Sequence, residues 1–597
     1  MNVSYLHQSK NFMNKYIFLS FFLISLATFA QKKDELGLRA IGTPHNPKVQ
    51  VAWNRYYAYD EVVEICRKIQ KAYPNLVTIE SIGKSFKGKD MWMMTITDSK
   101  GGKAENKPAF YIDGNIHSNE IQGTEIALYT AWYLAENHQS VKFIQELLQE
   151  KTFYIIPSIN PDARDEFLKN LNNANTPRSG VVPVDDDGDG TLDEDDFDDL
   201  NGDGEVTLMR RKTKTGRYIP HPEDPRQLIL AKPGEEGMYE LLGYEGLDND
   251  NDGFVNEDRK GYYDPNRDWG WNWQPDYIQS GANKYPFSLP ESRNVMEFVM
   301  KHPNIAGSQH YHNYSGMFLR GPGAEEDQFT YAPSDIAVYD VLGKTGEKMI
   351  PGYKYLVSYK DLYTTYGGAS EWMHAGRGVT AFVNELMTSY LLFDKNPDAG
   401  IGRFENNEFY EFDKLLLFGD AFIEWKAFKH PNYGDIEIGG FKKNYVRNHP
   451  GFLLEQDAHR NMAFTLFHAY HTPKLEVVEV KSKPLGNGFT QITATVANTR
   501  LIPTHLSHDI KNKINPPNYV TLKGESVVAG LLMENADFNI GKEQKGNPPA
   551  TVEVINIAGM GNVKVRWIVK GSPKNYNIEL KSAKGGLSTH TGTIQAE

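Results

Sequence analysis

Short apolar runs alternate with segments of helical period through most of the chain. The runs have the length of buried strands and are bounded by turn residues, whereas apolar residues three and four positions apart mark the helices. Strands are predicted at 76–83, 91–98, 107–117, 151–160, 305–314 and 378–386, and helices at 57–73, 120–137 and 292–303. This alternation predicts an α/β fold with a mixed, largely parallel sheet flanked by helices.

The pattern changes near Pro473. From there on, short runs of alternating apolar and polar residues follow one another, separated by turn residues. Such a succession is typical of an all-β sandwich. We therefore predict an α/β domain over residues 31–472, with an acidic insertion at about 176–262, followed by a β-sandwich domain over residues 473–597.

The first residues have the pattern of a secretory signal peptide. Lys10 and Lys15 precede the apolar run 16–30, whose small residues lead to Ala30, and a polar stretch begins at Gln31. The run is shorter than the about 20 residues that a membrane-spanning helix needs. The residue directly after Ala30 is not a cysteine that could carry a lipid. We predict cleavage after residue 30, no membrane anchor afterwards, and a secreted or periplasmic protein of bacterial type.

One short segment carries most of the net charge. The chain has 64 basic and 77 acidic residues, for a formal net charge of -13, and about twelve of the acids lie between Asp185 and Glu205. The remainder is close to neutral, which argues against a nucleic-acid-binding surface. Cys66 is the single cysteine, so no internal disulfide holds the loops of this exported chain.

Three acidic repeats in the insertion have the spacing of calcium-binding loops. In DDDGDGTLDEDD, carboxylates fall at positions 1, 3, 5, 9 and 12, with glycine at position 6. Dense oxygen donors suit Ca²⁺ better than zinc; a solvated acidic loop is the alternative. The expected structural calcium ligands are Asp185, Asp187, Asp189, Asp193, Asp196, Asp199, Asn201, Asp203, Asp248, Asp250 and Asp252.

Two segments place metal-binding side chains just past predicted strands. His117 and Glu120 lie three positions apart in GNIHSNEIQG, and His310 and His312 end the predicted strand at 305–314. In α/β sheets, polar groups at the C-terminal ends of strands form the site. The HxxE spacing alone also occurs among ordinary surface residues. A chain with one cysteine cannot build the cysteine-rich set of a structural zinc site.

The segment IHSNE, followed much later by HNYSGMFLRGPG, resembles the zinc metallocarboxypeptidases of the carboxypeptidase A/B type. The resemblance runs from about residue 57 to about residue 428 and includes NPDAR, DPNRDW, LYTTYGGASEW and FVNELM. It implies a carboxypeptidase-like fold and one catalytic zinc ion held by His117, Glu120 and His312. His310 is the alternative to His312 as third ligand.

The same resemblance implies roles for further side chains. Glu385 is expected to be the catalytic glutamate, and Arg211, with Arg210 as its competitor, is expected to polarise the scissile carbonyl. The residues expected to bind the substrate are Asn266 and Arg267 at its terminal carboxylate, Tyr363 closing over it, and Ser370 at the side-chain pocket.

The predicted function is that of a secreted zinc-dependent metallocarboxypeptidase acting on the C-termini of proteins or peptides. Two departures from the resemblance bear on specificity. Asn119 stands where the animal digestive enzymes carry arginine, and Ser370 is neither the apolar residue nor the aspartate of relatives with a marked preference. The alternatives are a hydrolase of cell-wall stem peptides and a calcium-dependent binding protein on an inactive peptidase scaffold.

Overall fold

The computed structural model describes residues 40–261, 263–389, 393 and 406–596. The chain divides after Gln50 into two units, and residues 40–50 of the first contain turns, bends and irregular backbone. All helices and strands given below lie in the second unit. The predicted signal peptide at residues 1–30 lies outside the described residues. Among the helices described, none is long and apolar enough to cross a membrane.

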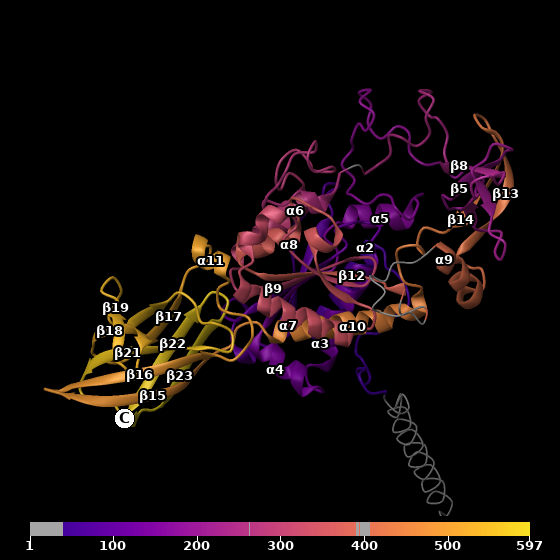
Figure 1. The fold of residues 1–597 in the computed structure, drawn as a ribbon. Helices are drawn as coiled ribbons and strands as arrows, with labels where there is room; N and C mark the ends of the chain where they lie inside the picture. Colours follow the sequence, from indigo (N-terminus) through magenta and orange to yellow (C-terminus); the bar gives the residue numbers. More distant parts are fainter. Residues whose placement is uncertain (1–39, 262, 390–392, 394–405, 597) are drawn as a thin grey trace, which may run out of the picture. The chain divides into compact units, whose positions relative to one another are not determined.

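A mixed sheet of eight strands forms the centre of the second unit (Figure 1). Its strands are β1 (Val77–Lys84), β2 (Asp90–Ile96), β3 (Ala109–Gly114), β4 (Thr152–Ile156), β9 (Ile305–Asn313), β10 (Met317–Arg320), β11 (Lys354–Val357) and β12 (Thr380–Leu386). Their order is β1-β2-β4-β3-β9-β12-β10-β11, and the run from β4 to β12 is parallel. The predicted mixed, largely parallel sheet is confirmed.

Helices cover both faces of this sheet. They are α2 (Tyr59–Ala72), α3 (Gln122–Asn137), α4 (Lys142–Glu150), α5 (Pro161–Lys169), α6 (Pro290–Lys301), α7 (Pro333–Met349), α8 (Ala369–Glu371) and α10 (Gly451–Tyr470). A further helix, α9 (Asn406–Phe412), lies away from this sheet (Figure 1) and packs Phe412 in a cluster with Ala421 and Tyr445. Figure 1 shows α6 and α8 on one face, and α3, α7 and α10 on the other. Successive strand residues point to opposite faces, so Phe110 packs against His468 of α10, while Tyr111 joins a cluster with Phe298 of α6. Burial on both faces explains the continuous apolar runs of the parallel strands.

The register of the parallel strands decides which polar side chains meet at one edge of the sheet. His312 of β9 lies opposite Glu385 of β12, and His310 lies opposite Asp113 of β3. All four residues are close to the C-terminal ends of their strands. The pairing therefore gathers polar groups from three strands at the edge where α/β sheets place their sites.

The loop after β3 is held tight by a close approach of two glycines. A Cβ atom built on Gly114 would lie 2.6 Å from the carbonyl carbon and oxygen of Gly123, in the first turn of α3. Only glycine permits two backbone segments to come this close. Residues 115–121 therefore fold back sharply between β3 and α3, and this loop carries His117 and Glu120.

A second sheet of six strands combines the insertion with a later part of the chain. Its strands are β5 (Leu208–Lys212), β6 (Tyr218–Pro220), β7 (Leu228–Leu230), β8 (Tyr239–Tyr244), β13 (Phe422–His430) and β14 (Gly434–Phe441), in the order β13-β14-β5-β8-β6-β7. The acidic repeats form turns and bends around it. This sheet was not predicted. Its strands β5 to β8, within the insertion, have only three to six residues and carry little periodic signal. In addition, β5 pairs with β14, which is remote in sequence.

Two further sheets follow from Leu475 onward, with orders β19-β18-β21-β16-β15-β24 and β20-β17-β22-β23. Their strands are β15 (Leu475–Gly486), β16 (Phe489–Asn498), β17 (Asn518–Leu522), β18 (Val527–Asn535), β19 (Ile540–Glu543), β20 (Thr551–Val554), β21 (Asn562–Lys570), β22 (Asn575–Ser582), β23 (Gly586–Thr593) and β24 (Gln595–Ala596). Trp567 of one sheet and Val520 of the other share a single apolar cluster, as in a β-sandwich. One short helix, α11 (Ser507–Asn512), was not predicted.

The glycine contact gives a test of how the fold supports the loop at 115–121. Substituting Gly114→Ala places a methyl group 2.6 Å from backbone atoms of Gly123, so the strand end or the helix start must move. We expect the free energy of unfolding of the α/β domain to fall by about 1–3 kcal/mol. Thermal and urea unfolding measure this effect.

Gly546→Ala is the matched control for the glycine test, because a Cβ atom there meets nothing within 4 Å. It should unfold like the wild type. A Gly114→Ala variant as stable as this control would show that the contact does not constrain the loop.

Candidate metal centre

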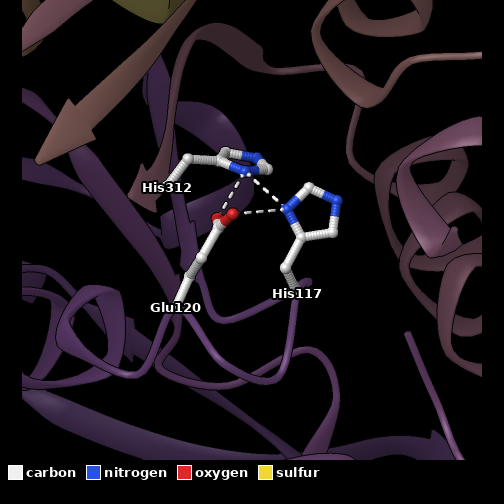
Figure 2. Close-up of side chains that lie close together, drawn as sticks. All are labelled: His117, Glu120 and His312. Carbon is white, nitrogen blue, oxygen red and sulfur yellow. Dashed lines mark hydrogen bonds and ion pairs between the residues drawn. The ribbon is translucent and has the colours of Figure 1, made fainter. Parts of the chain in front are cut away.

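Two imidazoles and a carboxylate converge at the C-terminal edge of the central sheet. His117, Glu120 and His312 offer three ligand atoms within 4.8 Å of one another, and all three residues are buried. The Nδ1 atoms of the two histidines are 3.2 Å apart, and the Glu120 oxygens lie 3.1 and 3.0 Å from them. Figure 2 shows the three side chains pointing toward one another. The structure thus brings the three predicted ligands together.

One asparagine shapes the loop that carries the first two ligands. Asn115 has a φ of 59°, in the left-handed region that asparagine tolerates better than most residues. Its side-chain amide donates to the carbonyl oxygens of His117, at 2.9 Å, and Ser118, at 3.1 Å. These bonds satisfy buried backbone oxygens. They fold the chain into a turn from which His117 and Glu120 reach the same point.

Charged partners surround the three candidate ligands. His117 contacts Asp264 Oδ1 through Nε2 at 2.8 Å, which orients the ring with Nδ1 toward the cluster. Arg178 Nη1 lies 2.7 Å from Glu120 Oε1. Burial by itself raises the pKa of both carboxyl groups, but His117 and Arg178 more than offset it and hold the pKa values of Glu120 and Asp264 well below the usual range. Both groups are therefore ionised at neutral pH.

His310 lies outside this cluster. Its Nδ1 is 2.7 Å from Asp113 Oδ2, and its Nε2 is 3.1 Å from Ser308 Oγ, so both ring nitrogens have partners. The geometry favours His312 as the third ligand. A set of two imidazoles and one carboxylate fits zinc, since catalytic zinc sites keep three protein ligands and one open position.

A cavity beside the three candidate ligands is lined by His117, His312 and Glu385. Burial raises the pKa of the Glu385 carboxyl to about 7; His312 opposes this rise and Glu120 adds to it. A carboxyl group with such a pKa can both accept and release a proton near neutral pH. Glu385 therefore combines a position beside the candidate metal ligands with a pKa close to neutral.

The four residues predicted to bind the substrate line the same cavity. Arg267 is 7% exposed and donates from Nη1 to the backbone oxygen of Asn266 at 2.7 Å. Ser370 donates from Oγ to Glu371 Oε2 at 2.9 Å. Tyr363, by contrast, is 55% exposed. The cavity therefore combines a nearly buried cation with an aromatic ring that solvent can reach.

The structure does not bring Arg211 to this cavity. Arg211 lies on β5 of the second sheet, where its Nη2 atom pairs with Glu240 at 2.7 Å. Its neighbour Arg210 pairs with Glu437 at 2.6 Å. The guanidinium that lines the cavity beside Glu120 belongs to Arg178. Arg178, and not the predicted Arg211, is therefore the arginine that lies beside the candidate metal ligands.

Arg178 and Asp264 were not singled out from the sequence, because the acidic insertion separates them. Arg178 stands in NTPRSG just before the acidic segment, and Asp264 opens DPNRDW just after it. One signal was available: each residue lies at an end of the insertion, where the α/β pattern of the sequence is interrupted and where it resumes.

Three groups of acidic side chains meet in the insertion, and their membership differs in part from the prediction. The groups are Asp187, Asp189, Glu194 and Asp250; Asp185, Asp187 and Asp258; and Asp248, Asp250 and Asp252. Two predicted ligands have other partners, since Asp193 accepts from the Val184 N–H and Asp196 pairs with Lys260. Asp199, Asn201 and Asp203 accept from N–H groups of their own loop, as do Asp185, Asp187, Asp189, Asp250 and Asp252.

Comparison with known families agrees with this geometry. Residues 62–179 and 243–396 match the model of the zinc carboxypeptidase family. The matched segments include the three candidate ligands, Arg178 and Glu385, whereas Arg211 falls in the unmatched interval. The chain therefore carries a domain of the zinc carboxypeptidase family. Residues 474–593 match a second model, described as a domain of unknown function.

Individual relatives carry the same family name. Carboxypeptidase B of Astacus astacus is 23% identical over 347 residues, covering 56% of this chain and 87% of that protein. Carboxypeptidase D of Anas platyrhynchos is 30% identical over 112 residues, covering 19% of this chain and 8% of that protein. The match to the carboxypeptidase D proteins of mouse and rat covers 9% of their length.

Solved structures give distant likenesses. Carboxypeptidase A from Helicoverpa armigera has a TM-score of 0.41 and 15% identity, covering 77% of this chain and 86% of that one. Thrombin-activatable fibrinolysis inhibitor has a TM-score of 0.40 and 14% identity, covering 70% of this chain and 75% of that one.

The orientation of His117 by Asp264 can be tested through metal affinity. Asp264→Asn removes the charge that holds the imidazole, so we expect zinc affinity to fall about tenfold or more. Competition with a chromophoric chelator measures it. Asp113→Asn, which changes the partner of His310, is the control and should keep the wild-type affinity. Weaker binding in the control, with no change in Asp264→Asn, would contradict the assignment of His312 over His310.

Proposed function

We propose that this protein is a secreted, zinc-dependent metallocarboxypeptidase that hydrolyses the C-terminal peptide bond of peptides or proteins. The observation that carries the proposal is one cavity lined by Glu385, Arg267 and the two imidazoles, His117 and His312, that meet Glu120. A metal centre alone is compatible with many hydrolases. A nearly buried arginine in the same cavity adds a binding point for a free carboxylate.

The catalytic roles follow from these positions. Zinc held by His117, Glu120 and His312 would supply a Lewis acid and lower the pKa of a water molecule at its open position. Glu385 accepts the proton of the attacking water and delivers it to the amine that leaves, since its pKa suits transfer in both directions. Arg178 lies beside Glu120 and offers a fixed positive charge to the oxygen on which negative charge develops.

Substrate binding rests on the other cavity residues. Arg267 presents a planar fork of N–H donors that pairs with a carboxylate in two parallel hydrogen bonds, which lysine cannot do. Asn266 lies beside it and Tyr363 lies at the cavity wall, where each adds a hydrogen bond to the bound end. A site that needs a terminal carboxylate removes one residue at a time.

Two alternative functions share part of this site. A cell-wall stem peptide also ends in a carboxylate, so it is the second substrate class that fits the same site. A binding protein on an inactive scaffold is disfavoured, because the candidate metal ligands, Glu385 and Arg178 line two cavities that share part of their walls. Secretion rests on the predicted signal peptide.

We also propose that the acidic insertion binds calcium as a structural ion. Glu194 meets Asp187, Asp189 and Asp250, and within the described residues both of its buried carboxylate oxygens lack a hydrogen-bond partner. Asp258, 1% exposed, also has a carboxylate oxygen without a partner in that part of the chain. Buried carboxylates without donors are costly, and a hard cation with oxygen ligands would relieve that cost.

The peptidase proposal is tested with peptides that differ only at the C-terminus. Wild-type enzyme should release the last residue of a free-acid peptide and leave the C-terminal amide of the same sequence intact, because Arg267 needs a carboxylate. Glu385→Gln should keep zinc near one per chain and lose at least about a hundredfold in rate. Mass spectrometry of products and metal analysis give the readouts. Equal cleavage of acid and amide would refute the exopeptidase assignment.

The two arginine candidates are separated in the same assay. Arg178→Ala should lower the rate about a hundredfold or more, because it removes a fixed charge beside the reacting oxygen. Arg211→Ala should stay within about twofold of the wild type, because its guanidinium pairs with Glu240 away from the cavity. The reverse ranking would restore Arg211 to the role predicted from the sequence.

The calcium proposal is tested by thermal unfolding of the zinc-loaded protein. Calcium at about 100 times its dissociation constant should stabilise the chain by about 2.7 kcal/mol, and magnesium should do much less. The double variant Asp187→Asn, Asp250→Asn should lose the calcium response. Asp60→Asn, at an exposed position of α2, should keep it. No calcium response in the wild type would leave a solvated acidic insertion as the correct description.

A further inference from the structure

A second cavity adjoins the metal centre at Glu120. It shares Arg178, Arg267, Tyr363 and Glu385 with the first. The first cavity reaches the nearly buried residues of the side-chain pocket, such as Ser370. If the last residue of a substrate occupies the first cavity, the preceding residues have to pass through the second one.

Arg447 lines the second cavity and comes from a segment outside the family resemblance. Its guanidinium carbon lies 5.4 Å from the centre of the Tyr314 ring, and its Nη1 atom lies 3.8 Å from Glu120 Oε1. The buried Nε atom has no hydrogen-bond partner in the part of the chain that the structure describes. The Nη1 atom of Arg447 also donates to the Asn313 carbonyl at 3.4 Å. A guanidinium has five N–H donors, so Arg447 still has donors that the described part of the protein does not use.

The backbone at 447–449 is fixed to the two segments that carry the metal ligands. Asn313, the residue after His312, donates from its side chain to the Arg447 carbonyl at 2.9 Å. Asn448 donates to the Asn119 carbonyl at 3.1 Å and accepts from the Gln122 N–H at 3.3 Å. These bonds lie on both sides of the ligand cluster. Arg447 is thus held in a constant position relative to the metal centre.

Asn119, in the loop between His117 and Glu120, is uncharged and places no cation beside the metal centre. It is fully buried, and its amide donates to the Ala174 carbonyl at 3.3 Å. Asn119 does not line either cavity, whereas Arg447, fixed beside it through Asn448, lines the second. A guanidinium from a remote segment therefore stands in the space that the preceding residues of a substrate have to cross.

We propose that Arg447 binds a main-chain carbonyl oxygen of the substrate on the N-terminal side of the scissile bond. The inference rests on the proposed peptidase function. A carbonyl is the group that every peptide presents at this place whatever its side chains, and a guanidinium donates to it well. Arg447 thus makes the enzyme prefer peptides that extend beyond the scissile bond over minimal substrates.

A purely electrostatic role for Arg447 makes a different prediction. If its only function were to stabilise the Glu120 carboxylate at 3.8 Å, removing it would weaken metal binding and slow every substrate equally. Contact with a substrate carbonyl, by contrast, affects only substrates that have that carbonyl. Substrate length and metal content therefore separate the two roles.

The experiment uses the zinc-loaded full chain and three substrates with the same C-terminal residue. They are an N-acyl amino acid that ends at the scissile carbonyl, an acylated tetrapeptide, and that tetrapeptide with a trans-alkene in place of the upstream peptide bond. Arg447→Ala should lower kcat/KM for the tetrapeptide about tenfold or more, mostly through KM. The change for the N-acyl amino acid should stay within about twofold. In Arg447→Ala, the alkene should cause no further loss.

Controls keep each outcome decisive. Arg447→Lys, which keeps a charge but loses the fork, should recover part of the tetrapeptide rate. Lys442→Ala, which removes a cation paired with Asp420 nearby in the chain, should match the wild type. An equal loss on all three substrates, a loss of zinc, or no change at all would overturn the proposal for Arg447. A wild-type protein that hydrolyses none of them would overturn the peptidase function itself.

Discussion

The site depends on one electrostatic constraint: a carboxylate and two imidazole nitrogens meet in a buried space. Such a cluster is stable only when positive charge lies within or around it. Arg178 and Arg447 lie at 2.7 and 3.8 Å from Glu120, and the cluster itself fits a divalent cation. The surrounding arginines therefore have two tasks, because they balance the ligand carboxylate and also face the space where a substrate would bind.

The insertion is part of this site rather than an appendage to it. Arg178 stands at its start, and Asp264 and Arg267 stand at its end. Within the insertion, β5 pairs with β14, and the chain that leaves β14 continues to Arg447. The second sheet thus connects the segments whose charged side chains lie at the metal centre. A long insertion is compatible with a fixed metal-binding site because both of its ends, and the segment that follows its sheet partner β14, place side chains beside the same centre.

Acidic side chains are buried both at the metal centre and in the insertion, and their charges are balanced in different ways. At the metal centre, Glu120 and Asp264 have histidine and arginine partners, and their pKa values lie well below the usual range. In the insertion, burial and then neighbouring acids together raise the pKa of the Asp186 carboxyl to about 6 and that of Glu257 to about 7. Basic side chains of the protein balance the carboxylates at the metal centre. The acidic insertion has few basic side chains, so a bound cation would balance its charge.

The local pattern of the chain was enough to predict the α/β fold, the sandwich strands, and the ligand segments at His117 and His312, because strand period, strand ends and short motifs are properties of neighbouring residues. The choice of His312 over His310 came from the family resemblance. The local pattern could not predict the second sheet or the positions of Arg178 and Arg447 beside the metal centre. Those depend on strand register and on contacts between segments far apart in sequence. Arg211 and Arg178 are both arginines in polar surroundings of the sequence; only the path of the chain around the insertion decided which one lies 2.7 Å from Glu120.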